Sequence, residues 1–312
     1  MTKRSILLTG VSSFTGYWFA KTLYANGVDI TCPLPRSKCE YTELKKKRLD
    51  SLKDQVRLVY DCPYGSGKFI KLCSEHFDTL CLHGSYVLDY TSDRFLLTRA
   101  LSANLRSTEK TLEILKGNGC KRVIWTSSVF ENAVNFYDTK CSKPNWYRYA
   151  LSKYLSYTAI SELCRGYDYE FSRVVITNPF GPLEDKKLSY QVFQSLLNQE
   201  EEFIIKTPYY VRDMIHVQNL ALVYTETTLS NKFYPEVKPC EYTGSIISFV
   251  RRYIEEVGKR THVKLKIYSK NMDFDEPYLL SNDQHISSFL KDFHSEKYWD
   301  DLCNYYFGIN KL

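Results

Sequence analysis

The sequence has no apolar run long enough to cross a membrane. A spanning helix needs roughly 20 consecutive apolar residues, and no segment of the 312 residues approaches that length. Met1–Arg4 precede only the short apolar segment Ile6–Leu8, which is too brief for the core of a signal peptide. We therefore expect a cytoplasmic protein with no membrane partner.

The sequence also shows no sign of metal, disulfide or nucleic-acid sites. Its ten cysteines include no Cys-x-x-Cys pair and its six histidines lack ligand spacing, so we expect reduced thiols and no metal. Lys and Arg number 42 against 36 Asp and Glu, a net charge of +6, and no long basic run predicts a nucleic-acid partner. This mild excess would suit a phosphorylated substrate, and it also fits ordinary solubility.

Strands and helices are predicted to alternate along the first part of the chain. Short apolar runs indicate strands at residues 5–9, 28–32, 56–60, 78–85 and 122–126. Helical periodicity indicates helices at residues 17–25, 43–53, 104–116 and 149–164, and further helices at 188–198, 220–228 and 245–257. This order predicts an α/β fold with a doubly wound parallel sheet. We expect a dinucleotide-binding Rossmann domain over residues 1–177 and a smaller substrate-binding lobe over 178–312, interleaved with the first.

A glycine turn joins the first predicted strand to the first predicted helix. Gly10-Val11-Ser12-Ser13-Phe14-Thr15-Gly16 has the strand–turn–helix context of a dinucleotide-binding loop, in which the helix N-terminus receives a pyrophosphate. Ser13 stands where the fingerprint has its middle glycine, so it either fits with a slight shift or donates its hydroxyl. A purely structural glycine turn is the alternative.

The ends of the next strands indicate which dinucleotide is bound. The second strand lacks the carboxylate that NAD sites place against the ribose 2′-hydroxyl, and Arg36 and Lys38 follow it instead. These residues favour NADP(H), with NAD(H) also possible, unless both are simply solvated loop charges. Asp61 closes the third strand where the adenine often lies, and Gly84 lies in a small-residue turn that lets a cofactor approach the backbone. His83 is expected to pack near the cofactor rather than to act in catalysis.

Tyr149 and Lys153 form the candidate proton-transfer pair. A spacing of four residues on a helix places both side chains on one face. A nearby ammonium favours the phenolate form of tyrosine, whose usual pKa is about 10. Ser128 ends the fifth predicted strand, and ligands of such sheets bind beyond the carboxyl ends of the strands, so Ser128 and Tyr149 can converge there. An accidental Tyr-x-x-x-Lys on a solvated helix is the alternative, because the chain has 26 tyrosines.

Five motifs together resemble the extended short-chain dehydrogenase/reductase family, the group that contains nucleotide-sugar epimerases, dehydratases and reductases. They are the Gly10–Gly16 turn, Ser127-Ser128, Tyr149-x-x-x-Lys153, Asn178-Pro179-Phe180-Gly181-Pro182 and Arg212-Asp213-Met214-Ile215-His216-Val217. The resemblance implies Tyr149 as the acid–base group, Lys153 as the residue that lowers its pKa and holds the nicotinamide ribose, and Ser128 as the residue that orients the reacting oxygen.

The resemblance also implies the binding residues and partners. Cofactor contacts are expected from Gly10, Ser12, Ser13, Phe14, Thr15, Gly16, Arg36, Asp61, Gly84, Tyr149 and Lys153. Substrate contacts are expected from Ser128, Asn178 and Arg212, the last two with the diphosphate of a nucleotide-diphosphate sugar. Arg212 could instead pair with Asp213 or another carboxylate, while Asp213 and His216 are expected to brace the loop. The family further implies a homodimer formed by the helices at 104–116 and 149–164.

Four functions remain open at the sequence level. Related 4,6-dehydratases carry an Asp-Glu pair directly after the catalytic Ser or Thr, but this chain has Val129-Phe130 there and Glu131 one position too late. We therefore expect a reductase of a 4-keto-6-deoxy sugar nucleotide, with a 4-epimerase that keeps NAD bound as the alternative. A catalytically silent NADP-binding sensor or scaffold, and a reductase of a non-nucleotide carbonyl compound, are the remaining readings.

Overall fold

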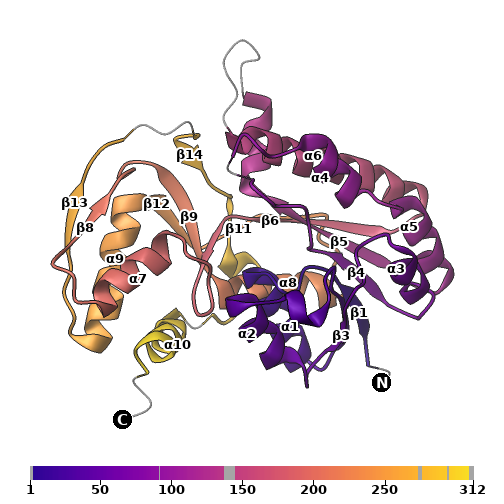
Figure 1. Ribbon diagram of the computed structural model, residues 1–312, viewed down its shortest axis with the longest axis horizontal. Coiled ribbons are helices and arrows are strands. Elements are labelled where there is room, and N and C mark those ends of the chain that lie inside the picture. The colour runs from indigo at the N-terminus through magenta and orange to yellow at the C-terminus, as the bar shows by residue number, and fades with distance from the viewer. Residues whose placement is uncertain (1–2, 91, 137–144, 273–275, 294, 309–312) are drawn as a thin grey trace. The chain divides into compact units, whose positions relative to one another are not determined.

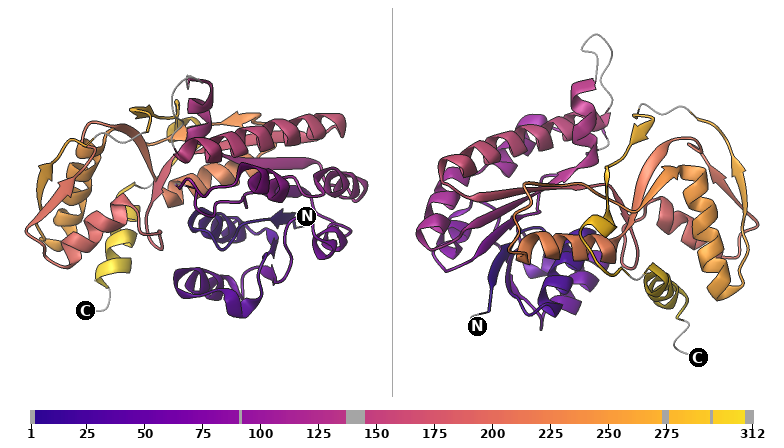
Figure 2. Two further views of the ribbon diagram at one scale, coloured as in Figure 1. Left: turned by 45° about the horizontal axis from the view of Figure 1, so that its top comes forward. Right: turned by 180° about the vertical axis from the view of Figure 1, so that it is seen from behind.

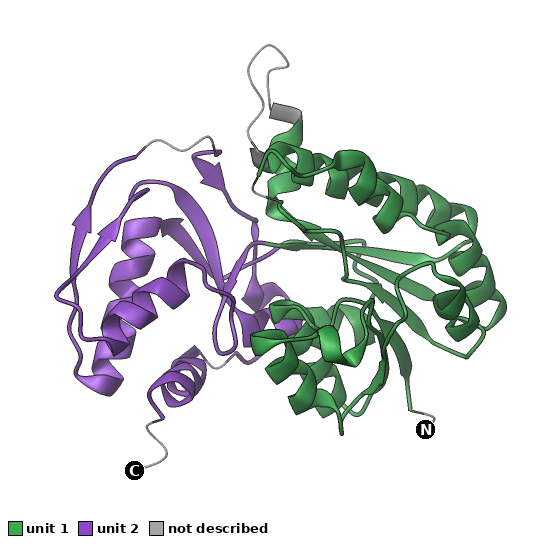
Figure 3. Ribbon diagram, in the orientation of Figure 1, with its two compact units in different colours: residues 1–176, 224–238 green, residues 177–223, 239–312 purple. Residues whose placement is uncertain are grey.

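The computed structural model describes residues 3–90, 92–136, 145–272, 276–293 and 295–308. The chain divides into two compact units, each built from two segments of the sequence (Figure 3). Unit 1 contains residues 1–176 and 224–238, and unit 2 contains residues 177–223 and 239–312. The chain therefore leaves unit 1, begins unit 2, and returns to unit 1 before completing unit 2.

Seven parallel strands form the centre of unit 1 (Figure 1). They are β1 (Ser5–Leu8), β2 (Asp29–Pro33), β3 (Arg57–Val59), β4 (Thr79–Leu82), β5 (Arg122–Ser128), β6 (Glu170–Ile176) and β10 (Glu236–Val237). Their spatial order is β10-β6-β5-β4-β1-β2-β3. The inner order 3-2-1-4-5-6 is that of the Rossmann fold, which confirms the predicted α/β class with a doubly wound parallel sheet.

Helices cover both faces of this sheet (Figure 2). They are α1 (Phe14–Ala25), α2 (Glu43–Leu52), α3 (Gly67–Leu72), α4 (Leu97–Asn104), α5 (Thr108–Gly117), α6 (Asn145–Gly166) and the second half of α8 (Val217–Leu229). On one face, Phe19 of α1 stacks on Tyr224 of α8 with 3.9 Å between ring centroids. On the other, Trp125 of β5 packs in one buried cluster with Leu112 of α5 and Ile160 of α6. Apolar side chains on both faces explain why the strands read as continuous hydrophobic runs.

Two predicted helices of unit 1 differ from the structure. The helix expected over 104–116 is present as α5 but begins at Thr108, because Ser107, with a left-handed φ of +51°, separates it from α4. The helix expected to open at Tyr149 begins at Asn145, so Tyr149 lies one turn inside α6. In addition, residues 220–228 were expected in the smaller lobe, whereas α8 enters unit 1 at Tyr224.

Unit 2 is an α+β unit around one aromatic core. Its four-stranded sheet contains β7 (Asn178–Phe180), β9 (Val211–His216), β12 (Tyr242–Ser245) and β14 (Leu279–Leu280), and two strand pairs are formed by β8 (Glu202–Ile205) with β13 (Lys266–Ser269) and by β11 (Pro239–Cys240) with β15 (Gln284–His285). Its helices include α7 (Leu188–Leu197), α9 (Ile246–Thr261) and α10 (Ser295–Phe307). Phe180, Tyr253 and Trp299 share a buried cluster. The aromatic C-terminal segment therefore contributes to the packing of this unit.

Candidate active site

The glycines of the turn after β1 are required by close backbone contacts. Gly10 has a φ of +78°, and a Cβ atom there would lie 2.7 Å from the backbone of Gly84. A Cβ atom on Gly16 would lie 2.3 Å from the Gly10 carbonyl oxygen. The turn thus presses against the segment after β4, and the N-terminus of α1 presents backbone N–H groups that fit a pyrophosphate. The predicted dinucleotide loop therefore has a backbone-lined cradle.

Ser13 uses its hydroxyl inside the turn. Its Oγ accepts a hydrogen bond from the Gly16 N–H at 3.1 Å as the N-cap of α1, and donates to the Gly10 carbonyl at 2.8 Å. The same oxygen lies 3.0 Å from the His83 Nε2 atom. The sequence left two alternatives for Ser13. The structure favours the first, in which the serine fits within the turn, because its hydroxyl is already engaged by protein groups.

His83 packs behind the turn. Its Nε2 atom also lies 3.0 Å from the Thr15 hydroxyl, and its ring meets Phe19 edge-on at 5.0 Å. Burial, assisted by the Lys153 ammonium, lowers the pKa of His83 to about 3. The imidazole is therefore neutral at physiological pH. This agrees with the expected packing role and does not suit a general acid.

The ends of β2 and β3 meet through the backbone. The Asp61 N–H donates to the Arg36 carbonyl at 3.1 Å, so these two predicted cofactor residues are neighbours. The Arg36 and Lys38 side chains are exposed. Glu40, the first carboxylate after β2, accepts from the Ser37 N–H at 2.8 Å, and its hydrogen bonds to Ser37 lower its pKa. The carboxylate nearest to the end of β2 is therefore engaged in hydrogen bonds within its own turn.

Arg48 supports the glycine turn and was missed by the sequence analysis. It lies in the helix predicted over 43–53 and is fully buried. Its guanidinium donates to the Ser12 carbonyl at 3.2 Å and lies 5.8 Å from the Phe14 ring centroid. The available signal was helical spacing, since Arg48 lies one turn before the buried Leu52.

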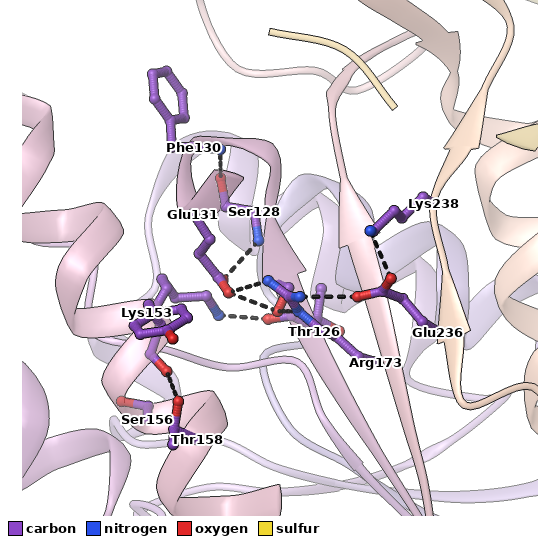
Figure 4. A network of polar contacts seen from close by, with 12 residues as sticks. Thr126, Ser128, Phe130, Glu131, Lys153, Ser156, Thr158, Arg173, Glu236 and Lys238 are labelled. Carbon is purple, nitrogen blue, oxygen red and sulfur yellow. Dashed lines mark hydrogen bonds and ion pairs between the residues drawn. The ribbon is translucent and has the colours of Figure 1, made fainter. Parts of the chain in front are cut away.

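Ser128 ends β5 at the carboxyl edge of the sheet. Its N–H donates to the Glu131 carboxylate at 3.0 Å, and its Oγ accepts weakly from the Phe130 N–H at 3.4 Å (Figure 4). Glu131 belongs to the 3-10 segment η2 (Val129–Phe136) that follows β5 directly. The Ser128 side chain also lies near the phenol of Tyr149 and lowers the pKa of that phenol. The structure therefore brings the two predicted catalytic hydroxyls together.

Tyr149 is held between aromatic rings that the sequence did not identify. Its ring lies 5.1 Å from that of Tyr90 and 6.2 Å from that of Phe95, both in the segment between β4 and α4. Burial raises the pKa of Tyr149, the Glu131 carboxylate raises it further, and Ser128 opposes both effects. The resemblance implied a lowered pKa. In this structure the phenol is instead protonated at neutral pH.

Lys153 lies one turn along α6 and is buried against the end of β5. Its Nζ atom donates to the Thr126 carbonyl at 2.5 Å and to the Ser85 hydroxyl at 2.8 Å, and lies 4.2 Å from the Trp125 ring centroid (Figure 4). Burial lowers the pKa of Lys153 to about 8. These contacts hold the ammonium on the main chain of β5.

Asn178 and Arg212 lie together in unit 2. Asn178 of β7 donates its amide to the Asp213 carbonyl at 3.0 Å, and these two strands are paired neighbours. Arg212 of β9 donates to the Tyr278 carbonyl at 3.1 Å and pairs with the Glu276 carboxylate at 3.1 Å. Arg212 therefore pairs with a carboxylate, as the alternative to diphosphate binding expected. That carboxylate belongs to Glu276 rather than to Asp213.

Asp213 and His216 are buried within the same unit. The Asp213 carboxylate accepts from the Thr243 hydroxyl and from the Asn282 N–H. His216 stacks on Tyr298 with 5.1 Å between ring centroids, and burial lowers its pKa to about 3. Both side chains therefore brace unit 2, as expected.

Two absences apply to the part of the chain that the structure describes. No group of three or more His, Cys, Asp or Glu side chains there is arranged to hold a metal ion. Across the same residues, no helix combines the length and the apolar character needed to cross a membrane.

Comparisons with known proteins agree with this fold. A UDP-glucuronic acid 4-epimerase from Bacillus cereus, solved with UDP-glucuronic acid and NAD, gives a TM-score of 0.71 at 16% identity and covers 98% of this chain and 99% of its own. A UDP-N-acetylglucosamine 4-epimerase from Methanobrevibacter ruminantium M1, in complex with UDP-N-acetylmuramic acid, gives 0.73 at 14% identity and 100% coverage of both chains. A dTDP-glucose 4,6-dehydratase from Streptomyces venezuelae, with NAD and TYD bound, gives 0.70 at 14% identity and 98% coverage of both.

Sequence comparison adds the family. No curated protein sequence matches the chain. A family model with the description "NAD dependent epimerase/dehydratase family" matches residues 6–228. This range includes the glycine turn, Ser128, Tyr149 and Lys153. The chain therefore belongs to the NAD dependent epimerase/dehydratase family, the extended short-chain dehydrogenase/reductase enzymes that its motifs resemble.

Proposed function

We propose that this protein is a nucleotide-sugar 4-epimerase that uses bound NAD, with Tyr149 as its acid–base residue. The observation that carries the proposal is that Ser128 lies near the Tyr149 phenol at the carboxyl end of β5, with Lys153 one helical turn away. A hydroxyl, a phenol and an ammonium on adjoining elements are suited to moving a proton at a sugar oxygen. The 4-epimerases named above, solved with UDP-sugars, support this reaction class.

The residues of the cradle fit a dinucleotide, and those at the end of β5 fit a sugar. The backbone N–H groups at the start of α1 and the close approach of Gly10 to Gly84 would hold the pyrophosphate. The dinucleotide would supply the hydride acceptor and donor. Ser128 would orient the sugar oxygen, while Tyr149 would accept its proton during oxidation and return it during reduction.

The titration of Tyr149 and Lys153 fits the reduction step directly. A buried phenol with a raised pKa is a proton donor at neutral pH. Its return to the phenolate requires a nearby cation, and the Lys153 ammonium is held at Thr126 and Ser85 on the same side of α6. Movement of this ammonium away from the Thr126 carbonyl would serve the oxidation step.

The second candidate is an NADPH-dependent reductase of a 4-keto sugar nucleotide. The specific observation in its favour lies at the end of β2, where Arg36 and Lys38 are exposed and the Glu40 carboxylate is engaged by Ser37. Exposed cations without a free carboxylate suit a ribose 2′-phosphate better than a 2′-hydroxyl. The two candidates therefore require different dinucleotides: the epimerase uses NAD and the reductase uses NADPH.

The deciding experiment is a matrix of substrates and dinucleotides. UDP-, GDP-, CDP- and dTDP-sugars and their 4-keto forms are incubated with the protein and either NAD or NADPH, and products are separated chromatographically. An epimerase converts a sugar nucleotide to its C4 epimer without net consumption of dinucleotide. A reductase consumes one NADPH per product, followed by absorbance at 340 nm. Binding of a dinucleotide without turnover of any sugar nucleotide would favour the sensor.

The Tyr149→Phe variant tests the proposed acid–base residue. We expect dinucleotide affinity to be retained and turnover to fall by at least about 100-fold, because the ring keeps its aromatic contacts while the proton carrier is lost. The matched control is Tyr154→Phe, which removes a phenol from a partly exposed position on the same helix. Near-normal turnover of Tyr149→Phe would contradict the proposal.

A further inference from the structure

A buried ion pair lies directly behind Ser128. The Glu131 side chain is fully buried, and its Oε2 atom lies 2.8 Å from the Arg173 Nη2 atom of β6. The other carboxylate oxygen accepts the Ser128 N–H at 3.0 Å. One carboxylate thus joins the candidate catalytic serine to a buried guanidinium (Figure 4).

Ser127 closes this network into a compact clamp. Its hydroxyl donates to Glu131 Oε2 at 3.1 Å and accepts from Arg173 Nε at 3.0 Å. Three donors therefore converge on Glu131: the Ser127 hydroxyl, the Ser128 N–H and the Arg173 guanidinium. A fully satisfied carboxylate of this kind cannot turn outwards to reach a substrate without breaking its bonds to all three donors.

Arg173 is fixed from several sides. Its Nη1 atom pairs with Glu236 of the edge strand β10 at 2.9 Å, and its guanidinium lies 4.3 Å from the Tyr157 ring centroid of α6. Lys238 lies 2.6 Å from the other oxygen of Glu236. The network therefore links β5, β6, β10 and α6, which are the elements that place Ser128, Tyr149 and Lys153.

We propose that Glu131 and Arg173 are a positioning pair that holds the end of β5 so that the Ser128 hydroxyl meets Tyr149. The proposal rests on the function assigned above to Ser128 and Tyr149. Glu131 follows Ser128 by three residues, so any movement of its carboxylate displaces the Ser128 backbone directly. Neither residue of the pair exchanges protons with substrate, because both are engaged by protein groups.

The pair also sets the charge around the proton-transfer residues. The groups that face Tyr149 are Glu131 from η2, Tyr90 from the segment after β4 and Ser128 from β5. Burial lowers the pKa of Lys153, Glu131 raises it, and Arg173 of β6 lowers it. Without the Glu131 charge, Arg173 would pair only with Glu236, which it shares with Lys238. The surroundings of Tyr149 would become more positive, which favours its phenolate form and lowers its pKa.

The first test compares Glu131→Gln with Glu170→Gln. Glu170 pairs with Arg122 at 2.7 Å between the same two strands, at their other end, so it is a matched control for the loss of a β5–β6 ion pair. For Glu131→Gln we expect kcat to fall by about 100-fold, because the serine is misplaced, while dinucleotide affinity is unchanged. The limb of the pH–rate profile in which Tyr149 accepts a proton should move to lower pH. Glu170→Gln should change neither.

The second test does not depend on enzymatic activity. In Glu131→Leu/Arg173→Met no unpaired charge remains buried, and the Ser128 N–H loses its carboxylate acceptor. We expect amide hydrogen exchange at Ser128, followed by NMR, to accelerate by about tenfold, the effect of losing one hydrogen bond. The Ile124 amide, in the middle of β5, should keep its rate.

The outcomes separate the two proposals. A wild-type protein without turnover on any sugar nucleotide contradicts the proposed function, while the Ser128 exchange rate still decides whether the pair positions that residue. An unchanged Ser128 rate in the double variant overturns the positioning role. So does a Glu131→Gln enzyme that keeps its kcat and its pH profile.

Discussion

Ser13 occupies the position of the middle glycine of a dinucleotide fingerprint, and its hydroxyl is engaged by Gly10 and Gly16. A glycine at this position gives the backbone access to phosphates. Here the serine caps α1 and contacts His83 while the neighbouring glycines keep the close approach to Gly84. The side chain thus stabilises the turn by capping the Gly16 N–H at the start of the helix.

Substitution of Ser13 tests this division of roles. We expect Ser13→Ala to lower the free energy of unfolding by about 1 kcal/mol, and Ser13→Gly to lower it by only a few tenths, which are the usual costs at an N-cap. Dinucleotide affinity should change by less than about twofold in either, since a factor of ten would require about 1.4 kcal/mol. Chemical denaturation and fluorescence titration measure the two effects.

The control for Ser13 is Ser66→Ala. This substitution removes the N-cap hydroxyl that accepts a hydrogen bond from the Phe69 N–H at the start of α3. It should cost similar stability without any effect on the dinucleotide. A Ser13→Gly variant that binds the dinucleotide more than tenfold more tightly would show that the serine obstructs the cradle.

Tyr149 and Lys153 show what spacing can and cannot predict at the scale of residues. The interval of four placed both on one face of α6, because helical geometry is local. The phenol pKa was expected to be lowered, but it depends on burial and on Glu131, which arrives from a different element. Likewise, the sequence identified Glu131 only as an acid one position too late for a dehydratase. Its partner Arg173 lies 42 residues further along the chain, so spacing did not predict the pair.

At the scale of elements, the segment between β7 and α7 contains a buried acid. Glu184 accepts a hydrogen bond from the Ser189 hydroxyl of α7 at 2.5 Å. Burial raises the pKa of Glu184 from 4.5 to about 8. A raised carboxyl pKa means that the folded protein binds this proton more tightly than the unfolded chain does. The stabilising contribution is therefore complete below pH 4.5 and is lost as the pH rises towards 8.

Glu184→Gln should remove this pH dependence. We expect the wild type to lose free energy of unfolding between pH 5 and pH 8.5 relative to the variant, by up to about 4 kcal/mol from the size of the shift. Urea denaturation at the two pH values measures the difference. Glu200→Gln, an exposed residue of the same unit, is the control and should follow the wild type. Parallel pH curves for wild type and Glu184→Gln would contradict the assignment.

The elements themselves were largely predictable, and the exceptions have local physical causes. Buried parallel strands read as short apolar runs, so all five strands expected in the first part of the chain are present. The helix expected over 104–116 is present as α5 but begins only at Thr108, because a left-handed residue, Ser107, separates it from α4. Serine at that position carries no stronger signal for a break than it does for a helix cap.

At the scale of the whole molecule, the two units share the chain unevenly. Tyr224 lies late in the sequence, yet it stacks on Phe19 in unit 1, next to the helix that follows the glycine turn. Arg122 of β5 likewise donates to the Thr228 carbonyl at 3.1 Å. Residues 224–238 are therefore part of unit 1.

Two tyrosine substitutions test this division. Tyr224→Ala and Tyr253→Ala each remove a fully buried ring, and each should cost about 3–5 kcal/mol of stability. Only Tyr224→Ala should also weaken dinucleotide binding, because Tyr253 packs with Phe180 and Trp299 in unit 2. Calorimetric titration of dinucleotide under conditions where both variants are folded makes the comparison. Equal loss of affinity in both variants would mean that the units do not act separately.

The sequence by itself determined the α/β class, the glycine turn and the helical spacing of Tyr149 and Lys153. Each of these depends on residues close together in the chain, where backbone conformation and hydrophobic period act directly. The tertiary structure alone decided the partners of the charged groups: Arg173 with Glu131, Arg212 with Glu276, and Lys153 with the Thr126 carbonyl. A buried charge takes whichever group the strand register and helix packing bring within reach, and that choice is not encoded in the spacing along the chain.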